Sequence, residues 1–272
     1  PDHVPETQEG MYLNRFTQAT FIPGSIFKIV TMAAVLEKAP QLQEDTFTCT
    51  GSYRMGVDVV TCGEAHGKQN TKQAFRNSCN CAFAQIAEAV GKKEMVDFVE
   101  KLDVTKALTF DGITTAQGNY NVSDTAPVTF AWSCIGQYND LINPAQFMTF
   151  MGAIAGDGSA AIPHVMGKVH SGEKLTYKPD TDKTDKIMSE QTAQTLQEYM
   201  RNNVVAVYGS SNFPGMTVCG KSGTSELGGE EVPNAMFSGF VTDEEYPLAF
   251  IWVVENGGFG SGACVPVLSR VL

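Results

Sequence analysis

The chain has 272 residues, 43% hydrophobic and 18% charged, a mixture too apolar for a disordered protein and too varied for a fibrous one. Acidic residues outnumber basic residues by 30 to 19, and the net charge of -11 argues against binding to nucleic acid or to an anionic membrane surface. The apolar stretch that includes 250–254 is far shorter than the roughly 20 residues of a membrane span.

Apolar spacing, capping residues and helix breakers predict the elements in chain order. Helices are expected over 25–37, over 71–90 with Thr71 as cap and a break near Asn77, over 92–102, over 144–155 after an Asn143-Pro144 start, from 189 onward, and over 263–272. Strand-like pieces are expected within 46–67, and three strands over 216–219, 234–242 and 248–254. These elements predict one domain over residues 1–272 of the α/β (α+β) class, with an antiparallel sheet flanked by helices.

The seven cysteines include at least one thiol without a partner in the chain, because their number is odd. Cys49 and Cys62 lie on either side of a turn-rich segment and could form a disulfide. His66 would complete a weak three-ligand metal set with them. Buried or idle thiols are the more common outcome, so neither a metal nor a cofactor is expected.

Three short motifs carry the candidate chemistry. They are S-x-x-K at Ser25-Ile26-Phe27-Lys28, S-x-N at Ser78-Cys79-Asn80, and K-[ST]-G at Lys221-Ser222-Gly223. Segments 171–174 and 210–212 also match the first two patterns, but they lie in polar, Gly-containing turns, whereas Ser25 opens an apolar helix and Ser78 leads into another. Each motif is weak alone, and together they form the signature of serine β-lactamases and penicillin-binding proteins.

The first motif fits a serine nucleophile with a lysine base. A serine in the first turn of a helix lies among unpaired backbone N–H groups, which favour a developing oxyanion. Ser25 and Lys28 share one helix face, so the amine can reach the hydroxyl. Lysine acts as a base when burial or a second cation lowers its pKa, and Lys221 could be that cation. The alternative is a capping serine and a lysine that extends from a core helix to solvent.

The other two motifs supply groups around that nucleophile. Ser78 offers a hydroxyl for proton relay and Asn80 an amide for substrate backbone, although a Ser-x-Asn before a helix is more often an ordinary cap. Lys221 and the three residues after it give a cation, two hydroxyls and a glycine that lets substrate backbone approach, although such a segment alone is more often a surface turn. Cys79, in the middle of its motif, is expected to point away from the cleft, buried and without a catalytic role.

The sequence resembles the transpeptidase domain of a penicillin-binding protein, of the monofunctional kind that acts in bacterial cell-wall synthesis. Beyond the motifs, the resemblance includes Asn14-Arg15, Pro23-Gly24, Ala82-Phe83, Gly136-Gln137, Asn143-Pro144-Ala145-Gln146 and the segments 220–226, 234–240 and 255–258. It implies the serine β-lactamase and penicillin-binding-protein fold. In that family two strands precede the nucleophile helix, so we expect the domain to be cut at its N-terminal side, with those strands missing or supplied by a segment outside residues 1–272.

The resemblance implies that Ser25 attacks the D-Ala-D-Ala amide of a peptidoglycan stem peptide and that Lys28 takes its proton. Ser78 would help to pass a proton to the departing D-Ala, with Lys221 in the same catalytic set. The backbone N–H groups of Ser25 and Thr224 would form the oxyanion hole. The implied substrate-binding residues are Asn80, Ser222, Gly223 and Thr224. β-Lactam antibiotics, which mimic D-Ala-D-Ala, would acylate Ser25 and stay attached.

The resemblance also implies a location on the extracytoplasmic face of the bacterial cell membrane, an anchor in an N-terminal segment outside this chain, and cell-wall synthesis proteins as partners. A D,D-carboxypeptidase and a β-lactam-binding sensor domain remain alternatives. A hydrolytic β-lactamase ranks last, because class A requires a glutamate and an asparagine placed to activate the deacylating water, and class D requires S-x-V where this chain has Asn80.

Overall fold

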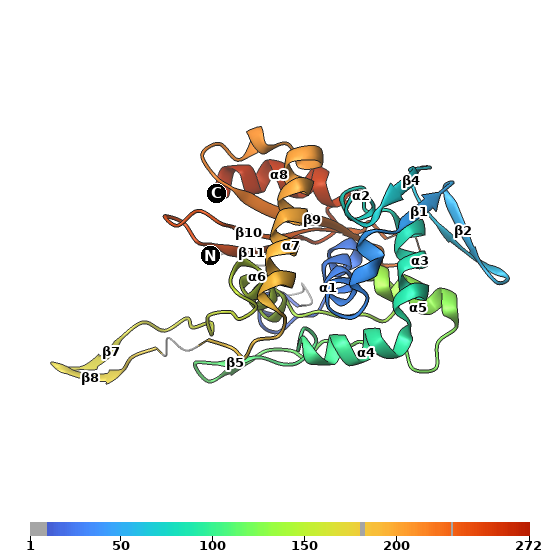
Figure 1. Cartoon of the computed structure of the whole chain (residues 1–272). Helices are drawn as coiled ribbons and strands as arrows, with labels where there is room; N and C mark the ends of the chain where they lie inside the picture. The colour runs from blue at the N-terminus through green and yellow to red at the C-terminus, as the bar shows by residue number, and fades with distance from the viewer. Residues whose placement is uncertain (1–9, 180–182, 230) are drawn as a thin grey trace.

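The computed structural model describes residues 10–179, 183–229 and 231–272 (Figure 1). The helices are α1 (Lys28–Lys38), α2 (Thr71–Arg76), α3 (Asn80–Val90), α4 (Lys92–Lys101), α5 (Pro127–Ile135), α6 (Pro144–Ala155), α7 (Glu190–Asn203) and α8 (Gly260–Val271). The strands are β1 (Thr46–Cys49), β2 (Ser52–Met55), β3 (Asp58–Thr61), β4 (Gly67–Asn70), β5 (Thr109–Phe110), β6 (Ile113–Thr114), β7 (Val169–Ser171), β8 (Lys174–Tyr177), β9 (Val218–Ser225), β10 (Asn234–Val241) and β11 (Ala249–Val254). Shorter helical turns are η1 (Gly24–Phe27), η2 (Pro40–Gln43), η3 (Val204–Tyr208) and η4 (Ser210–Asn212).

The main sheet is antiparallel, with strand order β11-β10-β9, so that β9 is an edge strand. Successive side chains of β10 point to opposite faces of this sheet. Ala235 and Phe237 pack with residues of α8, whereas Met236 and Phe240 pack into the larger helical core. Helix α8 therefore covers one face, and α6 and α7 cover the other (Figure 1). The expected antiparallel sheet flanked by helices is confirmed.

Helix α1 lies in the middle of the helical half of the molecule and is buried from Lys28 to Val35. It contacts α3, α4, α5 and α7, and the Thr31 hydroxyl donates to Cys134 O of α5 over 2.6 Å. An apolar helix surrounded by other helices has little freedom to move. The chain that carries the first motif is thus held by the core of the protein.

Several boundaries differ from the sequence prediction. The helix expected over 25–37 begins as the 3-10 turn η1, and α1 proper starts at Lys28, a common tightening at a helix N-terminus. Asn70, not Thr71, caps α2, because its side chain and that of Gln73 form a reciprocal capping box while the Thr71 hydroxyl donates to Leu42 O. The strand expected over 216–219 is β9, which extends through the whole third motif.

Three elements were missed by the sequence prediction. Helix α5 has Pro127 at its first position, a start signal that was overlooked. The hairpins β5–β6 and β7–β8 are short and exposed, and their strands lack a buried alternating face. Figure 1 shows β7–β8 extending away from the rest of the fold, which places the second S-x-x-K match, 171–174, far from the motifs around α1.

The front of the chain was expected to lack two sheet strands. Within the described stretch 10–22 the chain forms turns and one isolated bridge, between Phe21 and Ile142. The rest of that expectation concerns residues 1–9, which lie outside the described residues, and it stays a prediction. Among the described residues, no helix is both long enough and apolar enough to cross a membrane.

Candidate active site

Ser25 lies in the η1 turn, which is pressed against the edge of the sheet. Gly24 has φ +55°, its N–H donates to Gly136 O over 2.8 Å, and a Cβ atom there would come within 2.2 Å of Thr224 O. Glycine is the residue that tolerates both this conformation and this approach. Gly223 on β9 is similarly close, since its Cβ would meet Pro23 O at 2.9 Å. The two glycines let the serine turn and β9 touch backbone to backbone.

Lys28 follows one helical turn later and is fully buried. Its Nζ is within hydrogen-bond distance of four oxygens: Ser25 Oγ at 3.2 Å, Ser78 Oγ at 3.2 Å, Ser78 O at 2.6 Å and Asn80 Oδ1 at 2.7 Å. The ring of Phe83 lies beneath the same nitrogen, 5.3 Å from it. The lysine therefore joins the first motif to the second, and the alternative in which it extends to solvent is wrong.

Burial controls the protonation of both lysines in the site. Desolvation lowers the pKa of Lys28 from its ordinary 10.5 to about 7, against the opposite pull of the nearby Cys62, Cys79 and Cys81 thiols. The pKa of Lys221 is also held well below 10.5, first by burial and then by repulsion from Lys28. An amine with a pKa near neutrality is often found without its proton, as a general base requires.

The second motif lies in the break between α2 and α3. Ser78 has φ +51°, a left-handed conformation that is uncommon for a residue other than glycine and that occurs often at functional sites. Its hydroxyl lies between the two lysines, 2.9 Å from Lys221 Nζ. The Asn80 amide donates to Thr61 O over 3.1 Å, which orients its oxygen toward Lys28. Thr61 was not identified from the sequence, and no local pattern marks it.

The third motif lies along β9, where alternate residues face opposite sides of the sheet. Lys221 faces the helical core and reaches Ser78, whereas Ser222 faces the side covered by α8. The Ser222 hydroxyl is 2.9 Å from the hydroxyl of Tyr208, which also accepts a hydrogen bond from the Ser222 N–H. The structure therefore brings Lys221 to the other motifs but holds the Ser222 hydroxyl on Tyr208, a residue that sequence reasoning missed.

Thr224 faces the serine turn through its backbone. The Gln137 amide donates to Thr224 O over 3.2 Å, so this carbonyl points away from β10 and toward the segment that holds Ser25. In an antiparallel strand the N–H and C=O of one residue point to the same side. The Thr224 N–H is thus directed to the free edge of β9, where the predicted oxyanion hole would lie. The Thr224 hydroxyl accepts from the Gly260 N–H over 3.1 Å at the start of α8.

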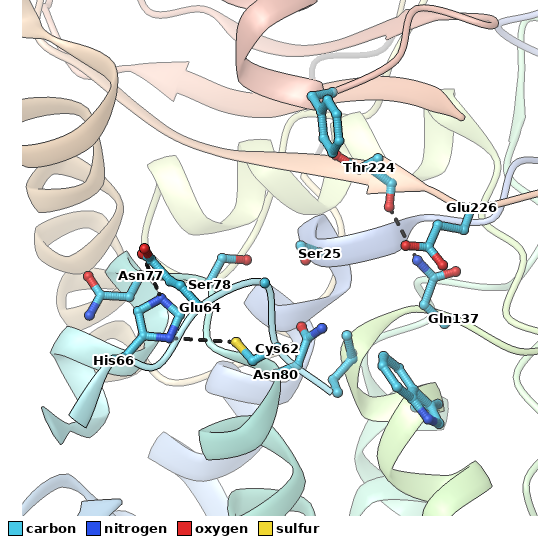
Figure 2. A pocket seen from close by; sticks show the side chains of 14 residues that line it. Ser25, Cys62, Glu64, His66, Asn77, Ser78, Asn80, Gln137, Thr224 and Glu226 are labelled. Carbon is cyan, nitrogen blue, oxygen red and sulfur yellow. Dashed lines mark hydrogen bonds and ion pairs between the residues drawn. The ribbon is translucent and has the colours of Figure 1, made fainter. Parts of the chain in front are cut away.

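These groups open onto a cleft of about 440 Å³ (Figure 2). Among the predicted site residues, Ser25, Ser78, Asn80 and Thr224 line it, while Lys28, Lys221 and Gly223 are buried and Ser222 is half-buried. Its wall also includes two carboxylates, Glu64 and Glu226, and three apolar side chains, Trp132, Ile135 and Phe259. Sequence reasoning identified none of these five.

The cysteines beside the cleft are free thiols, so the Cys49–Cys62 disulfide considered from the sequence is not formed. Cys79 is fully buried, which confirms the predicted burial, and its sulfur accepts from the Ala82 N–H over 3.4 Å as the cap of α3. Its lack of a catalytic role stays a prediction. Cys62 and His66 line the cleft on the side of the second motif (Figure 2).

A serine hydroxyl held by a buried lysine, with a second lysine and a Ser-x-Asn loop beside it, is the arrangement of serine β-lactamases and penicillin-binding proteins. The family model of the penicillin binding protein transpeptidase domain matches residues 1–272, and the chain belongs to this family.

The named relatives share low sequence identity with this chain but align with most of its length. The chain is 25% identical over 274 residues to stage V sporulation protein D of Bacillus subtilis, covering 93% of this chain and 42% of that protein. It is 26% identical over 260 residues to the peptidoglycan D,D-transpeptidase PbpA of Mycolicibacterium smegmatis, covering 90% of this chain and 52% of that protein. The chain spans about half the length of these relatives.

Solved structures with the same fold include penicillin-binding protein A from M. tuberculosis in a ceftriaxone acyl-enzyme complex. It matches with a TM-score of 0.86 and 22% identity, covering 94% of this chain and 61% of that one. The D,D-transpeptidase domain of a peptidoglycan glycosyltransferase from Eggerthella lenta matches with a TM-score of 0.86 and 22% identity, covering 98% and 69%. At this identity the likeness establishes the fold.

Proposed function

We propose that this chain is a peptidoglycan D,D-transpeptidase domain, which forms cross-links through an acyl-enzyme on Ser25 and is inhibited covalently by β-lactams. The observation that carries the proposal is the position of the buried Lys28 Nζ, 3.2 Å from Ser25 Oγ and 3.2 Å from Ser78 Oγ. A relative named as a peptidoglycan D,D-transpeptidase and a neighbouring fold solved as a β-lactam acyl-enzyme support it.

In the acylation step, neutral Lys28 accepts the proton of Ser25 while Oγ bonds to the carbonyl carbon of the D-Ala-D-Ala amide. The backbone N–H groups of Ser25 and Thr224 stabilise the negative charge on the carbonyl oxygen. As the C–N bond breaks, the amine of D-Ala takes a proton from Lys28 through the Ser78 hydroxyl. Lys28 is neutral again at the end of this step, and the stem peptide remains as an ester of Ser25.

In the transfer step, the amine of a second stem peptide attacks the ester carbonyl, and Lys28 takes the proton that the amine loses. Breaking the ester C–O bond returns that proton to Ser25 Oγ and leaves a new amide, the cross-link. A D,D-carboxypeptidase would use the same groups with water as the acceptor, so the two activities differ in the acceptor alone.

The anionic C-terminus of the stem peptide needs a cationic, hydrogen-bonding end of the cleft. Lys221 supplies the charge, and Asn80 and Thr224 supply polar groups on the cleft wall. Ser222 joins them once its hydroxyl exchanges Tyr208 for the substrate carboxylate. Gly223, without a side chain, keeps the approach along β9 open.

The proposal is tested by intact-mass spectrometry after exposure to penicillin. We expect one adduct, mapped to the peptide that contains Ser25 and persisting for minutes or longer. Ser25→Ala should abolish labelling, because the ester needs its oxygen. Ser171→Ala is the matched control, since Ser171 heads the second S-x-x-K match, and this variant should label normally. Rapid hydrolysis without an adduct would indicate a β-lactamase, and no reaction would refute the proposal.

A second assay separates the transpeptidase from the carboxypeptidase. The protein is incubated with a stem pentapeptide ending in D-Ala-D-Ala, with and without an added amine acceptor, and the product masses are measured by mass spectrometry. A cross-linked product supports the proposal. Release of D-Ala with hydrolysis alone would assign the chain to the carboxypeptidases.

For the whole protein, the proposal also includes an extracytoplasmic location, a membrane anchor outside this chain and cell-wall synthesis partners.

A further inference from the structure

Three thiols and one imidazole meet behind the second motif. The Sγ atoms of Cys49, Cys62 and Cys79 and a ring nitrogen of His66 all lie within 4.8 Å of one another. They come from four separate positions: the end of β1, the segment after β3, the residue before β4, and the cap of α3. The β1–β4 strand pair, the β2–β3 hairpin and the start of α3 thus converge on one point. Sulfur and imidazole nitrogen are the ligands that zinc prefers.

The spacing within the cluster is that of a tetrahedral site. Ligand bonds of Zn²⁺ to sulfur and nitrogen place neighbouring S and N atoms about 3.6 Å apart and neighbouring S atoms about 3.8 Å apart. His66 Nδ1 lies 3.6 Å from Cys49 Sγ and 3.5 Å from Cys62 Sγ. The Sγ atoms of Cys62 and Cys79 are 4.0 Å apart. These three separations are within a few tenths of an ångström of the tetrahedral values, and the other three are no longer than 4.8 Å.

The groups around the four side chains have the orientation that a metal needs. His66 turns Nδ1 toward the thiols, while Nε2 lies 3.4 Å from the Glu64 carboxylate. Metal-bound histidines usually donate their other ring N–H to such a partner, which sets the tautomer and the ring direction. Cys79 Sγ accepts the Ala82 N–H at the start of α3, where backbone N–H groups and the helix dipole favour a thiolate. Figure 2 shows His66 between Glu64 and Cys62.

We infer that Cys49, Cys62, Cys79 and His66 form a zinc site of the Cys₃His type. Four protein ligands complete a tetrahedral shell, so the metal has a structural role and offers no open position to water or substrate. This inference differs from the sequence prediction of no metal. That prediction considered three of the four ligands and treated Cys79 separately, as a buried thiol.

The site would position the second motif, a role that rests on the proposed function. Cys79 stands between Ser78 and Asn80, the two residues that contact Lys28. A metal bond to Cys79 would tie this loop to the β1–β4 strand pair and to the β2–β3 hairpin. It would also help to hold the left-handed backbone of Ser78. The four ligands are positioning residues, since none of them contacts the hydroxyl of Ser25 in the described structure.

Metal binding is tested first, without reference to activity. The chain is purified without chelator and its metal content is counted by mass spectrometry; about one zinc per chain is expected. The metal is then removed under reducing conditions and Co²⁺ is added as a probe. Absorption bands of tetrahedral cobalt with thiolate charge transfer support the site. A reduced chain that takes up neither zinc nor cobalt would refute the site, whether or not the native mass shows the loss of two hydrogens that marks a disulfide.

Variants locate the site within the chain. Cys49→Ser should weaken zinc binding by more than about 100-fold, beyond the range typical of loss of an outer partner. Glu64→Gln should weaken it by about 10–100-fold, and because this side chain is exposed, the variant tests the site even if the cysteine variant fails to fold. Cys264→Ala, which removes a buried thiol of α8, is the control and should bind fully. Equal loss in all three variants would place the metal elsewhere.

The positioning role has its own readout. Removing zinc from the chain should slow labelling by a fluorescent penicillin by up to about 100-fold, and added Zn²⁺ should restore the rate. In Cys49→Ser the slow rate should persist after zinc is added. Zinc binding with an unchanged labelling rate would retain the metal site and refute the positioning role. Absence of labelling in the zinc-loaded chain would refute the proposed function and leave the metal site standing.

Discussion

Lys28 and Lys221 donate hydrogen bonds to the same oxygen, the hydroxyl of Ser78, over 3.2 and 2.9 Å. Both amines are fully buried, and each has a lowered pKa. One hydroxyl thus connects the amine beside Ser25 to the amine on the sheet edge. In the proposed mechanism this connection would give proton transfer a direct path between the two halves of the fold.

Loss of the lysine beside the nucleophile should affect chemistry more than folding. In Lys28→Ala we expect the rate of acylation by penicillin to fall by about 10²–10⁴-fold, the usual range for a general base. Stopped-flow or quench-flow labelling measures this rate, and circular dichroism checks the fold. Lys38→Ala, at the exposed C-terminal end of α1, is the control. Acylation within a few-fold of the parent in Lys28→Ala would contradict the assignment of the base.

The acylation rate should depend on pH as the titration of Lys28 requires. Its pKa of about 7 means that the amine is mostly neutral above pH 7 and gains a proton below it. The rate should therefore fall by about tenfold for each pH unit below 7 and level off above it. The charged or titratable groups that face this amine are Lys221 from β9, Cys62, and Cys79 and Cys81 from the α3 side. A flat profile between pH 5.5 and 7, roughly the sensitive range, would contradict this prediction.

The contact between the serine turn and β9 should not tolerate a methyl group. Gly24→Ala would place Cβ within 2.2 Å of Thr224 O at a positive φ, so we expect a loss of about 3 kcal/mol in unfolding free energy, the upper range for overpacking. Denaturant titration gives this value. Gly167→Ala, where a Cβ meets nothing within 4 Å, is the matched control. Equal stability of the two variants would show that the turn can move away from the strand.

Tyr208 should stabilise the third motif through its hydroxyl. Tyr208→Phe leaves the Ser222 N–H and hydroxyl without their partner, and we expect a cost of about 1–3 kcal/mol in unfolding free energy. Tyr246→Phe, at an exposed position, should cost little and serves as the control. Thermal or denaturant unfolding of both variants provides the comparison. A cost for Tyr208→Phe no greater than that of the control would mean that the pair contributes nothing to stability.

The sequence indicated which side chains meet around Ser25, because these residues lie where elements begin and the family resemblance covers each motif. Lys28 follows Ser25 by one helical turn, so local geometry alone brings their side chains together. The contact between Ser78 and Lys221 spans 143 residues, and the resemblance, not the spacing, grouped these two residues in one site. The fold class followed from the apolar periodicity of the helices and the three C-terminal strands.

Other features depend on tertiary packing and had no local signal. Tyr208 lies in an irregular π-type turn, so no periodic pattern indicates that its hydroxyl meets Ser222. The cluster of Cys79 with Cys49 arises because the β1–β4 strand pair and the β2–β3 hairpin fold onto the start of α3. Sequence spacing does not reveal such convergence. Alternation along β9 could have shown that Ser222 and Lys221 face opposite sides, once the strand was known to extend through the motif.

Ser25, Ser78 and Lys221 come from three segments that the native fold brings together. Under the proposed function, a covalent penicillin label would count native molecules one by one, as an active-site titrant counts an enzyme. In partly denatured samples the labelled fraction should follow the loss of tertiary structure, including opening of the cleft that leaves the helices intact. The same label could measure the native fraction in a crude lysate, where spectroscopic probes cannot distinguish this chain from others.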